Sequence, residues 1–346
     1  MAAWTTIDDS ASKFKTLTYT GTGSALSITG VGFAPNIVYT KVYTGGDKTG
    51  LSTIPTGTAM LLQLSENATV TGSTYVTGFD ADGFTLGTGT EVNWNTYEYI
   101  NYNWLANTTT GIDTTGSTIT PTSYTLDQDA GVSFIRYTGN KTAAALVPHG
   151  LAATPDMILV KNLDASENWA CYHKNLDATA PEDKYLQPNT DAAVGDNLTH
   201  WNDTAPTSVN FSLGTADEVN GSSDAMVAWC FKGKQGYSRF STFIGNANVE
   251  GTMVMTGFRP AFIWIKSLDA SDWYSFDEQR VGYNPDNNNL TTDGTVAQNT
   301  TDRVNILSNG FKFIYTGEPN TTSTYIYAAF AHSPFCNSNG APANAR

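Results

Sequence analysis

Three short runs of the chain share one pattern of hydrophobic and polar positions. Each run begins at a proline and ends at a lysine six residues later, at residues 35–41, 155–161 and 260–266. From the second residue after the proline up to the lysine, every side chain is apolar, aromatic or β-branched. Successive side chains of a strand point to opposite faces, so neither face is polar before the lysine. The pattern predicts three strands that are covered on both faces at their middle.

Further landmarks recur around these runs in the same order. An aromatic residue followed closely by glycine precedes each run, at Tyr19, Tyr137 and Phe243. A phenylalanine at the start of another short strand follows each run, and then an apolar stretch at residues 99–106, 225–232 or 325–332. The prolines stand about 105 to 120 residues apart, which is the size of an antiparallel sandwich and too long for one propeller blade. We therefore predict an all-β chain of three tandem antiparallel β-sandwich repeats of about 100 residues.

The landmarks also predict where the repeats divide. We expect an N-terminal segment at 1–14, a divergent first repeat at 15–128, a second repeat at 129–235, and a third repeat with a C-terminal tail at 236–346. The dipeptides Asp82-Gly83 and Asn309-Gly310 are typical of tight hairpin turns. Because each repeat has its own landmarks, we expect the fragment 236–346 to fold alone.

Composition narrows the class of protein. Of 346 residues, 40 % are hydrophobic but only 14 % are charged, where about a quarter is usual. The surface must then be rich in Thr, Ser, Asn and Gly, as in exported or particle-bound β proteins. From this low-charge surface we also expect a homo-oligomer, with a trimer favoured. A net charge of −14 with 18 Lys and Arg argues against a nucleic-acid partner. The N-terminus lacks the pattern of a secretory signal, and no apolar run is long enough for a membrane segment.

The residues that usually carry chemistry show no catalytic or metal-binding spacing. The stretch 80–91 resembles a calcium loop, but its glycine stands at position four and Phe84 occupies a ligand position, so a hairpin is favoured. The cysteines are odd in number and scattered, and the histidines have no ligand spacing. These residues are Cys171, Cys230, Cys336, His149, His173, His200 and His332. We predict a non-enzymatic protein with no catalytic residues, no metal and no cofactor.

One loop occurs twice and is the sharpest local feature. Leu-Asp-Ala-Ser followed by a tryptophan gives Asp164 and Trp169 in the second repeat, and Asp269 and Trp273 in the third. One interpretation is a carbohydrate platform, with the indole face stacked on a sugar ring and the aspartate accepting from its hydroxyls. The other is a structural loop whose tryptophan fills the edge of the core, since tryptophan is mostly buried in folded domains. We rank packing first and retain the four residues as candidate binding residues.

The combination of these stretches resembles a repeat domain of tailed-bacteriophage structural proteins, especially marine and cyanobacterial ones. The resemblance rests on the Pro-Asp strand, the run "WACYHK" after the Asp-Ala-Ser loop, "TAPTSVNFSLG", and the closing "APANAR", and it covers about residues 130 to 346. It implies a virion component, tail-fibre-like or capsid-decorating, made in the host cytoplasm, with other virion proteins as partners and a host surface glycan as a possible contact. A weaker likeness to small β-sandwich lectins supports a glycan-binding alternative, and a glycosidase or depolymerase ranks lower still.

Overall fold

The structure is a computed structural model that describes residues 4–46, 50–53, 56–57, 60–67, 70–71, 74–280, 284 and 288–343. The chain is all-β, with 41 % of its residues in strands and 6 % in helices, and its sheets are antiparallel. This confirms the prediction of an all-β chain with antiparallel sheets. The closing residues 344–346 and parts of the stretch 43–55, which replaces the Asp-Ala-Ser loop near the N-terminus, lie outside the described residues.

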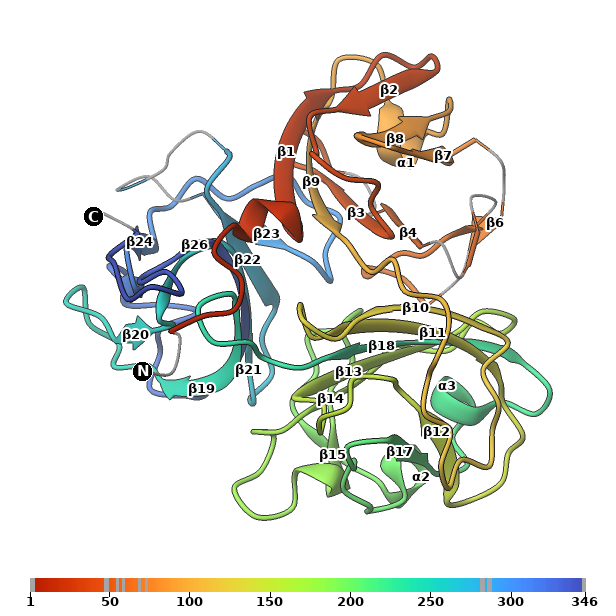
Figure 1. Cartoon of the computed structure of the whole chain (residues 1–346). Coiled ribbons are helices and arrows are strands. Elements are labelled where there is room, and N and C mark those ends of the chain that lie inside the picture. The colour runs from red at the N-terminus through yellow and green to blue at the C-terminus, as the bar shows by residue number, and fades with distance from the viewer. Residues whose placement is uncertain are drawn as a thin grey trace.

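Three main sheets form the framework (Figure 1). Sheet 1 has the order β1 (Phe14–Thr20), β9 (Glu98–Trp104), β3 (Ile37–Val42), β4 (Gly50–Thr53). Sheet 2 has the order β10 (Ser123–Asp127), β11 (Val132–Thr138), β18 (Ala225–Phe231), β13 (Met157–Asn162), β14 (Ala170–His173). Sheet 3 has the order β19 (Ser238–Ile244), β26 (Thr324–Pro334), β21 (Phe258–Ser267), β22 (Trp273–Asp277), β23 (Leu290–Thr291). The series β1-β9-β3-β4, β11-β18-β13-β14 and β19-β26-β21-β22 therefore follow one connectivity.

A smaller sheet covers the outer face of each main sheet. These sheets are β2 (Leu26–Thr29), β8 (Gly83–Leu86), β7 (Val76–Asp80); β12 (Ala145–Pro148), β17 (Asn210–Leu213); and β20 (Met253–Met255), β25 (Gly310–Phe313), β24 (Val304–Leu307). Two hairpins, β5 (Met60–Leu61) with β6 (Val70–Thr71) and β15 (Lys184–Tyr185) with β16 (Gly195–Asp196), lie in connections. The helices are single turns: η1 (Ser10–Ser12), α1 (Thr90–Asn93), η2 (Pro181–Asp183), α2 (Leu198–Trp201) and α3 (Asp217–Asn220).

The three proline-to-lysine runs form β3, β13 and β21, the strands expected to be covered on both faces. All described positions of β3 and β13 are buried, as are nearly all of β21, which confirms that expectation. Ile158 and Ile263 pack outward, each in a separate cluster beneath its smaller sheet. The neighbouring positions, such as Leu159 and Trp264, point the other way.

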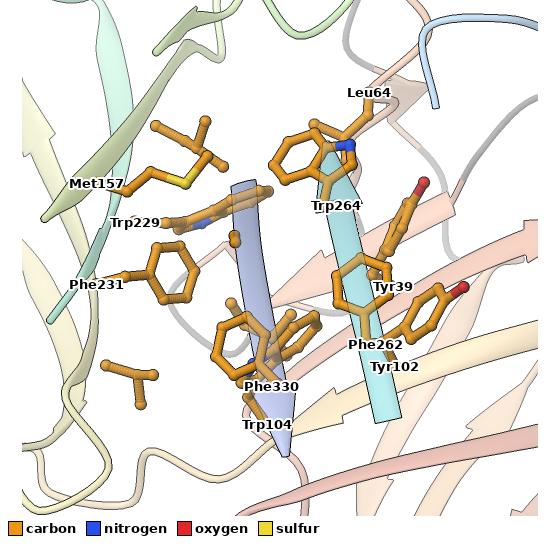
Figure 2. Close-up of a cluster of buried hydrophobic side chains, with 14 of the residues drawn as sticks. Tyr39, Leu64, Tyr102, Trp104, Met157, Trp229, Phe231, Phe262, Trp264 and Phe330 are labelled. Atoms are coloured by element: carbon orange, nitrogen blue, oxygen red, sulfur yellow. The ribbon is translucent and has the colours of Figure 1, made fainter. Parts of the chain in front are cut away.

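The inward faces of all three main sheets meet in one central cluster. It joins Tyr39 of β3, Leu159 of β13 and Trp264 of β21 to the strands that end each unit, here called the closing strands β9, β18 and β26, which contribute Trp229 and Phe330 among others. Figure 2 shows these aromatic rings converging between the sheets. At their centre lies a wholly apolar space of about 40 Å³, far below the roughly 300 Å³ at which ligand pockets begin. The three sheets are thus packed around a shared core.

A buried asparagine lies shortly before each of the strands β9, β18 and β26 and stabilises an equivalent turn in each case. Asn93, Asn220 and Asn320 are fully buried. Each side-chain oxygen accepts from a backbone N–H shortly after the first strand, at Thr22, Asn140 and Asn246 respectively, at 2.8–3.2 Å. Each amide nitrogen also donates to at least two main-chain carbonyl oxygens, so an otherwise irregular turn has its buried polar groups satisfied.

The predicted hairpins form, but their glycines lie in the strand after the turn and allow a neighbouring strand to approach closely. The turn between β7 and β8 is Ala81-Asp82, and Gly83 already pairs with Asp80 inside the ladder. A Cβ on Gly83 would lie 2.0 Å from the carbonyl oxygen of Ile28 on β2, and one on Gly310 would lie 2.0 Å from that of Val254 on β20. Close approach of the edge strand therefore requires glycine at both positions.

One element joins a different sheet than the sequence suggested. Strand β10 falls within the stretch 15–128 assigned to the first repeat, yet it pairs along its whole length with β11 of sheet 2. Residues before β10 also contact this part of the chain. Thr108 bridges to Leu126, and the Ile119 N–H donates to the Leu146 carbonyl at 3.0 Å. The chain therefore passes to sheet 2 soon after β9.

Candidate functional site

The lysine that ends each proline-to-lysine run is buried and reaches across to a neighbouring sheet's connections. Lys161 Nζ, from sheet 2, donates to the Asn67 carbonyl in the connection after β4 at 2.9 Å. Lys266 Nζ, from sheet 3, donates to the Asp191 carbonyl in the connection after β14 at 3.2 Å. Lys41 Nζ, from sheet 1, donates to the Gly294 carbonyl just after β23 at 2.6 Å. Sheet 2 thus contacts sheet 1, sheet 3 contacts sheet 2, and sheet 1 contacts sheet 3, so the three lysine contacts form a closed ring.

The Asp-Ala-Ser loops complete the lysine sites. The Lys161 ammonium also donates to the carbonyls of Asn162 and Glu167, both at 2.8 Å, and the Lys266 ammonium donates to those of Asp269 and Ser271. An ammonium group has three donors and no acceptor, so three converging carbonyl oxygens satisfy it without a carboxylate. The loops therefore curl around the buried cation of their own sheet.

The two loop tryptophans lie at the same junctions as the lysines. Trp169 and Trp273 are 0 % and 1 % exposed. Trp169 packs on Trp229 at 4.9 Å between ring centroids, and Trp273 on Trp264 at 4.6 Å. Their indole N–H groups donate across the junction, Trp169 to the Gln63 carbonyl at 2.8 Å and Trp273 to the Gln187 carbonyl at 3.2 Å. Neither ring has a free face on which a sugar could stack.

The candidate aspartates stand apart from the indoles. Asp164 and Asp269 are exposed, and the Asp164 carboxylate accepts from the Ala225 N–H at 2.7 Å, which fixes its own loop. Because the first loop lies at the junction of sheets 1 and 2 and the second at that of sheets 3 and 2, the four residues do not form one site. The structure places Trp169 and Trp273 as packing side chains between sheets.

Burial perturbs the ionisation of the groups at these junctions. Desolvation lowers the pKa of Lys161 to about 8, and nearby Glu167 and Glu218 oppose part of that effect. The pKa of Lys266 is also lowered, first by burial. Burial raises the pKa of Asp293 to about 6. Its carboxylate accepts from the backbone N–H of Trp273 at 3.1 Å. Such shifts are typical of functional sites but also of structural ion networks, and the carbonyl cages favour the structural interpretation here.

Two tryptophans are exposed, and the sequence patterns did not single them out. Trp94 is 46 % exposed and stacks on Tyr97 at 5.8 Å between centroids, with the ring planes 22° apart. The turn that carries this pair is held rigid, since the Gly21 N–H donates to the Tyr97 carbonyl and the Thr96 N–H to the Gly21 carbonyl. The corresponding turn before β18 has Gly221 and Asp224 in place of the two aromatics. This difference between the two turns was the sequence signal that could have identified Trp94 and Tyr97. Trp4, in the N-terminal segment, is 37 % exposed.

Other potential chemistry among the described residues is sparse. Cys171, Cys230 and Cys336 are free thiols, and burial raises the pKa of the first two well above that of an ordinary thiol. The described part of the chain brings no three His, Cys, Asp or Glu side chains close enough together to hold a metal ion. Within the same residues, no helix is both long enough and apolar enough to cross a membrane.

Comparison with known proteins gives one result. A family model described as "domain of unknown function (DUF7483)" matches residues 9–334. The comparison with curated proteins and the comparison with solved structures each return no match. The matched stretch runs from η1 to the end of β26, so a single family model spans all three main sheets.

Proposed function

Because the chain belongs to the DUF7483 family, whose description gives no function, we propose a role from its own geometry and sequence: a non-enzymatic structural component displayed on the surface of a bacteriophage particle. It would be a tail-fibre-like appendage or a capsid-decorating protein, with other virion proteins as partners. The ring of three lysine junctions is the observation that carries the proposal. Its most distinctive buried polar groups, Lys41, Lys161 and Lys266, bind one sheet to the next. A rigid, low-charge body of this kind suits a part that must survive outside the cell.

Within this proposal the chain consists of three tandem β-sandwich units. The shared strand order supports it, as do the equivalent buried lysines and asparagines. The pairing of β10 moves the first boundary from 128 to a point soon after β9, while the boundary near 235 lies between β18 and β19. The units would be fused into one body by the central cluster, as subunits of a trimer are fused by their interface.

The location can be tested directly on particles. Virions purified from lysates of the host in which this gene is expressed should contain peptides of the chain in fixed ratio to the major capsid protein by mass spectrometry. Gold-labelled antibody against the chain should then mark one place on intact particles in electron micrographs. If the chain stays in the soluble fraction of the lysate and particles lack it, the proposal fails.

Association of whole chains, with a trimer favoured, is a related proposal. It is supported by exposed apolar side chains at the end of β19, in the following connection and on β20: Ile244, Val249, Met253 and Met255. At the positions of the two methionines, β2 of sheet 1 has Ser27 and Thr29, which are ordinary surface residues. Sedimentation velocity at micromolar concentration should show an oligomer, and a Met253→Ser/Met255→Thr variant should be monomeric. A monomeric parent chain contradicts this proposal.

A second candidate function is glycan binding, and the exposed Trp94, stacked on the half-buried Tyr97, favours it. The ring of Tyr97 lies against Gly45, where an added Cβ would come within 2.6 Å, so the platform is fixed from behind. A rigid exposed aromatic face is what a sugar ring stacks on. The parent chain should then bind neutral oligosaccharides on a printed glycan array, and Trp94→Ala should lose that binding without a change in melting temperature. Equal binding by the variant would exclude this platform.

A further inference from the structure

One surface pocket combines an aromatic side chain with several cations. It measures about 390 Å³ and lies where the N-terminal segment meets the ends of β14, β18 and β19, a size within the usual range for ligand pockets. We call it the Trp4 pocket. The residues that matter here are Trp4, Asp156, Lys174, Lys232, Arg239 and Ser241.

Cations outnumber anions in this pocket. Lys174 Nζ and Lys232 Nζ each lie 3.1 Å from the same oxygen, Oδ1 of Asp156, whose other oxygen accepts from the Gly233 N–H at 2.7 Å. Arg239 adds a third cation, and Asp156 is the sole carboxylate among the described lining residues. The pocket thus carries a formal charge of about +2 on a chain of net charge −14. Such a local reversal of sign attracts an anion that the remaining surface repels.

The lysines keep donors for a ligand. Their side chains are 40 % and 31 % exposed, while the Asp156 side chain is 6 % exposed and is held from below. Each ammonium has three N–H donors, and the shared Asp156 oxygen takes one from each. The remaining donors can bind a carboxylate from the pocket side. Hydrogen bonds between an ammonium and a carboxylate are charge-assisted and therefore stronger than neutral ones.

An aromatic wall stands beside these cations. The Trp4 ring lies next to Gly257, where an added Cβ would be 3.8 Å from its Cζ2 atom. Its segment is anchored just downstream, because Thr5 is buried and Ile7 enters the central cluster. Ser241 brings a hydroxyl group to the same pocket, whereas the buried Thr256 hydroxyl is already bonded to the main chain of Phe258. An aromatic face, a hydroxyl and a surplus of cations together fit an anionic ligand that carries a ring better than a bare anion.

We propose that the Trp4 pocket binds a carboxylated sugar, such as a uronate residue of an acidic polysaccharide. Trp4 stacks on the pyranose ring, Lys174 and Lys232 hold the carboxylate, and Arg239 interacts with the next acidic residue at the mouth. This site is separate from Trp94 and independent of where the protein resides. It goes beyond the proposed structural role by naming what the surface contacts.

Isothermal titration calorimetry on the full chain tests the proposal. The probes are short oligomers of galacturonate, of guluronate and of a glucuronate-containing repeat, at low salt and pH 7.5. At least one should bind, and its methyl-esterified form, with the same rings but no charge, should not. Lys232→Gln and Trp4→Ala should each weaken binding by about tenfold or more. Lys184→Gln removes a lysine from the exposed pair with Asp196, outside the pocket, and should leave the affinity unchanged.

Several results would overturn it. Binding by none of the three oligomers, or equal binding of the esterified form, excludes a carboxylated sugar. Inorganic sulfate or a short oligonucleotide binding as tightly as the best sugar would show a general anion site. If Lys232→Gln does not fold, Trp4→Ala and the esterified probe still decide, since neither removes an ion pair. Unchanged affinity in Trp4→Ala excludes the stacking role on which the choice of sugar rests.

Discussion

Replacing Trp273 by alanine should destabilise the whole protein, because this side chain joins sheet 3 to sheet 2. The substitution empties a fully buried aromatic site, which costs about 3–5 kcal/mol. It also removes the ring contact with Trp264 and the hydrogen bond from the indole N–H to the Gln187 carbonyl. We expect a total loss of about 4 kcal/mol in the free energy of unfolding.

The size of the shift in melting temperature reports the cooperative unit. For 346 residues that unfold together, the entropy of unfolding is about 0.7 kcal/mol/K, so the loss lowers Tm by about 6 °C. If a unit of roughly 110 residues unfolded alone, the same loss would lower its Tm by about 17 °C and leave a second transition. The shared central cluster predicts the first result.

Calorimetry or circular dichroism on the purified variant measures this shift, and chemical unfolding gives the free energy. Trp94→Ala is the matched control, because it removes the same side chain from an exposed turn and should change stability by no more than about 0.5 kcal/mol. If Trp273→Ala keeps the parent stability, the indole is not a packing element and the assignment of the Asp-Ala-Ser loops is wrong.

Three further predictions concern the central cluster, a buried lysine and the buried histidines. The fragment 236–346, which sequence landmarks suggested would fold alone, should not form a native monomer, because Phe262, Trp264 and Phe330 would lose the neighbours that sheets 1 and 2 contribute to the central cluster; a dispersed NMR spectrum would contradict this. Lys161→Met should cost about 2–4 kcal/mol in chemical unfolding by leaving three carbonyls without their donor, whereas Lys184→Met on an exposed pair should cost less than about 1 kcal/mol. Stability should fall as pH drops below about 6.5, because burial lowers the folded-state pKa values of His149, His173 and His200 to about 4, 3 and 4. Each folded-state histidine stays neutral while the unfolded one gains a proton, so each costs about 1.4 kcal/mol per pH unit down to its folded pKa, and Asp293, raised to about 6, offsets one of them. Unfolding free energies that are equal at pH 7.5 and pH 5 would refute this.

The sequence by itself determined the strands and their faces. The unbroken apolar runs along β3, β13 and β21 identified residues such as Ile158 and Ile263 as buried, because successive side chains of a strand point to opposite sides and both sides were apolar. The hairpins before Phe84 and Phe311 were also predictable from their local Asp-Gly and Asn-Gly dipeptides, although each turn lies one residue earlier, at 81–82 and 308–309. Local rules determine these features, and local rules can be read along a chain.

Only the tertiary structure decided what each buried face packs against. The apolar runs show that Leu159 and Trp264 are covered but not which sheet covers them, because any apolar partner satisfies the pattern. The same limit applies to Trp169 and Trp273, whose repeated loops favoured core packing but left a sugar platform open until their N–H groups were seen to cross a junction. The lysines that end the three runs could have pointed to solvent as strand ends usually do. They are buried because the neighbouring sheet brings a carbonyl oxygen within hydrogen-bond distance of each ammonium, a contact made between residues 75 to 253 positions apart in the chain.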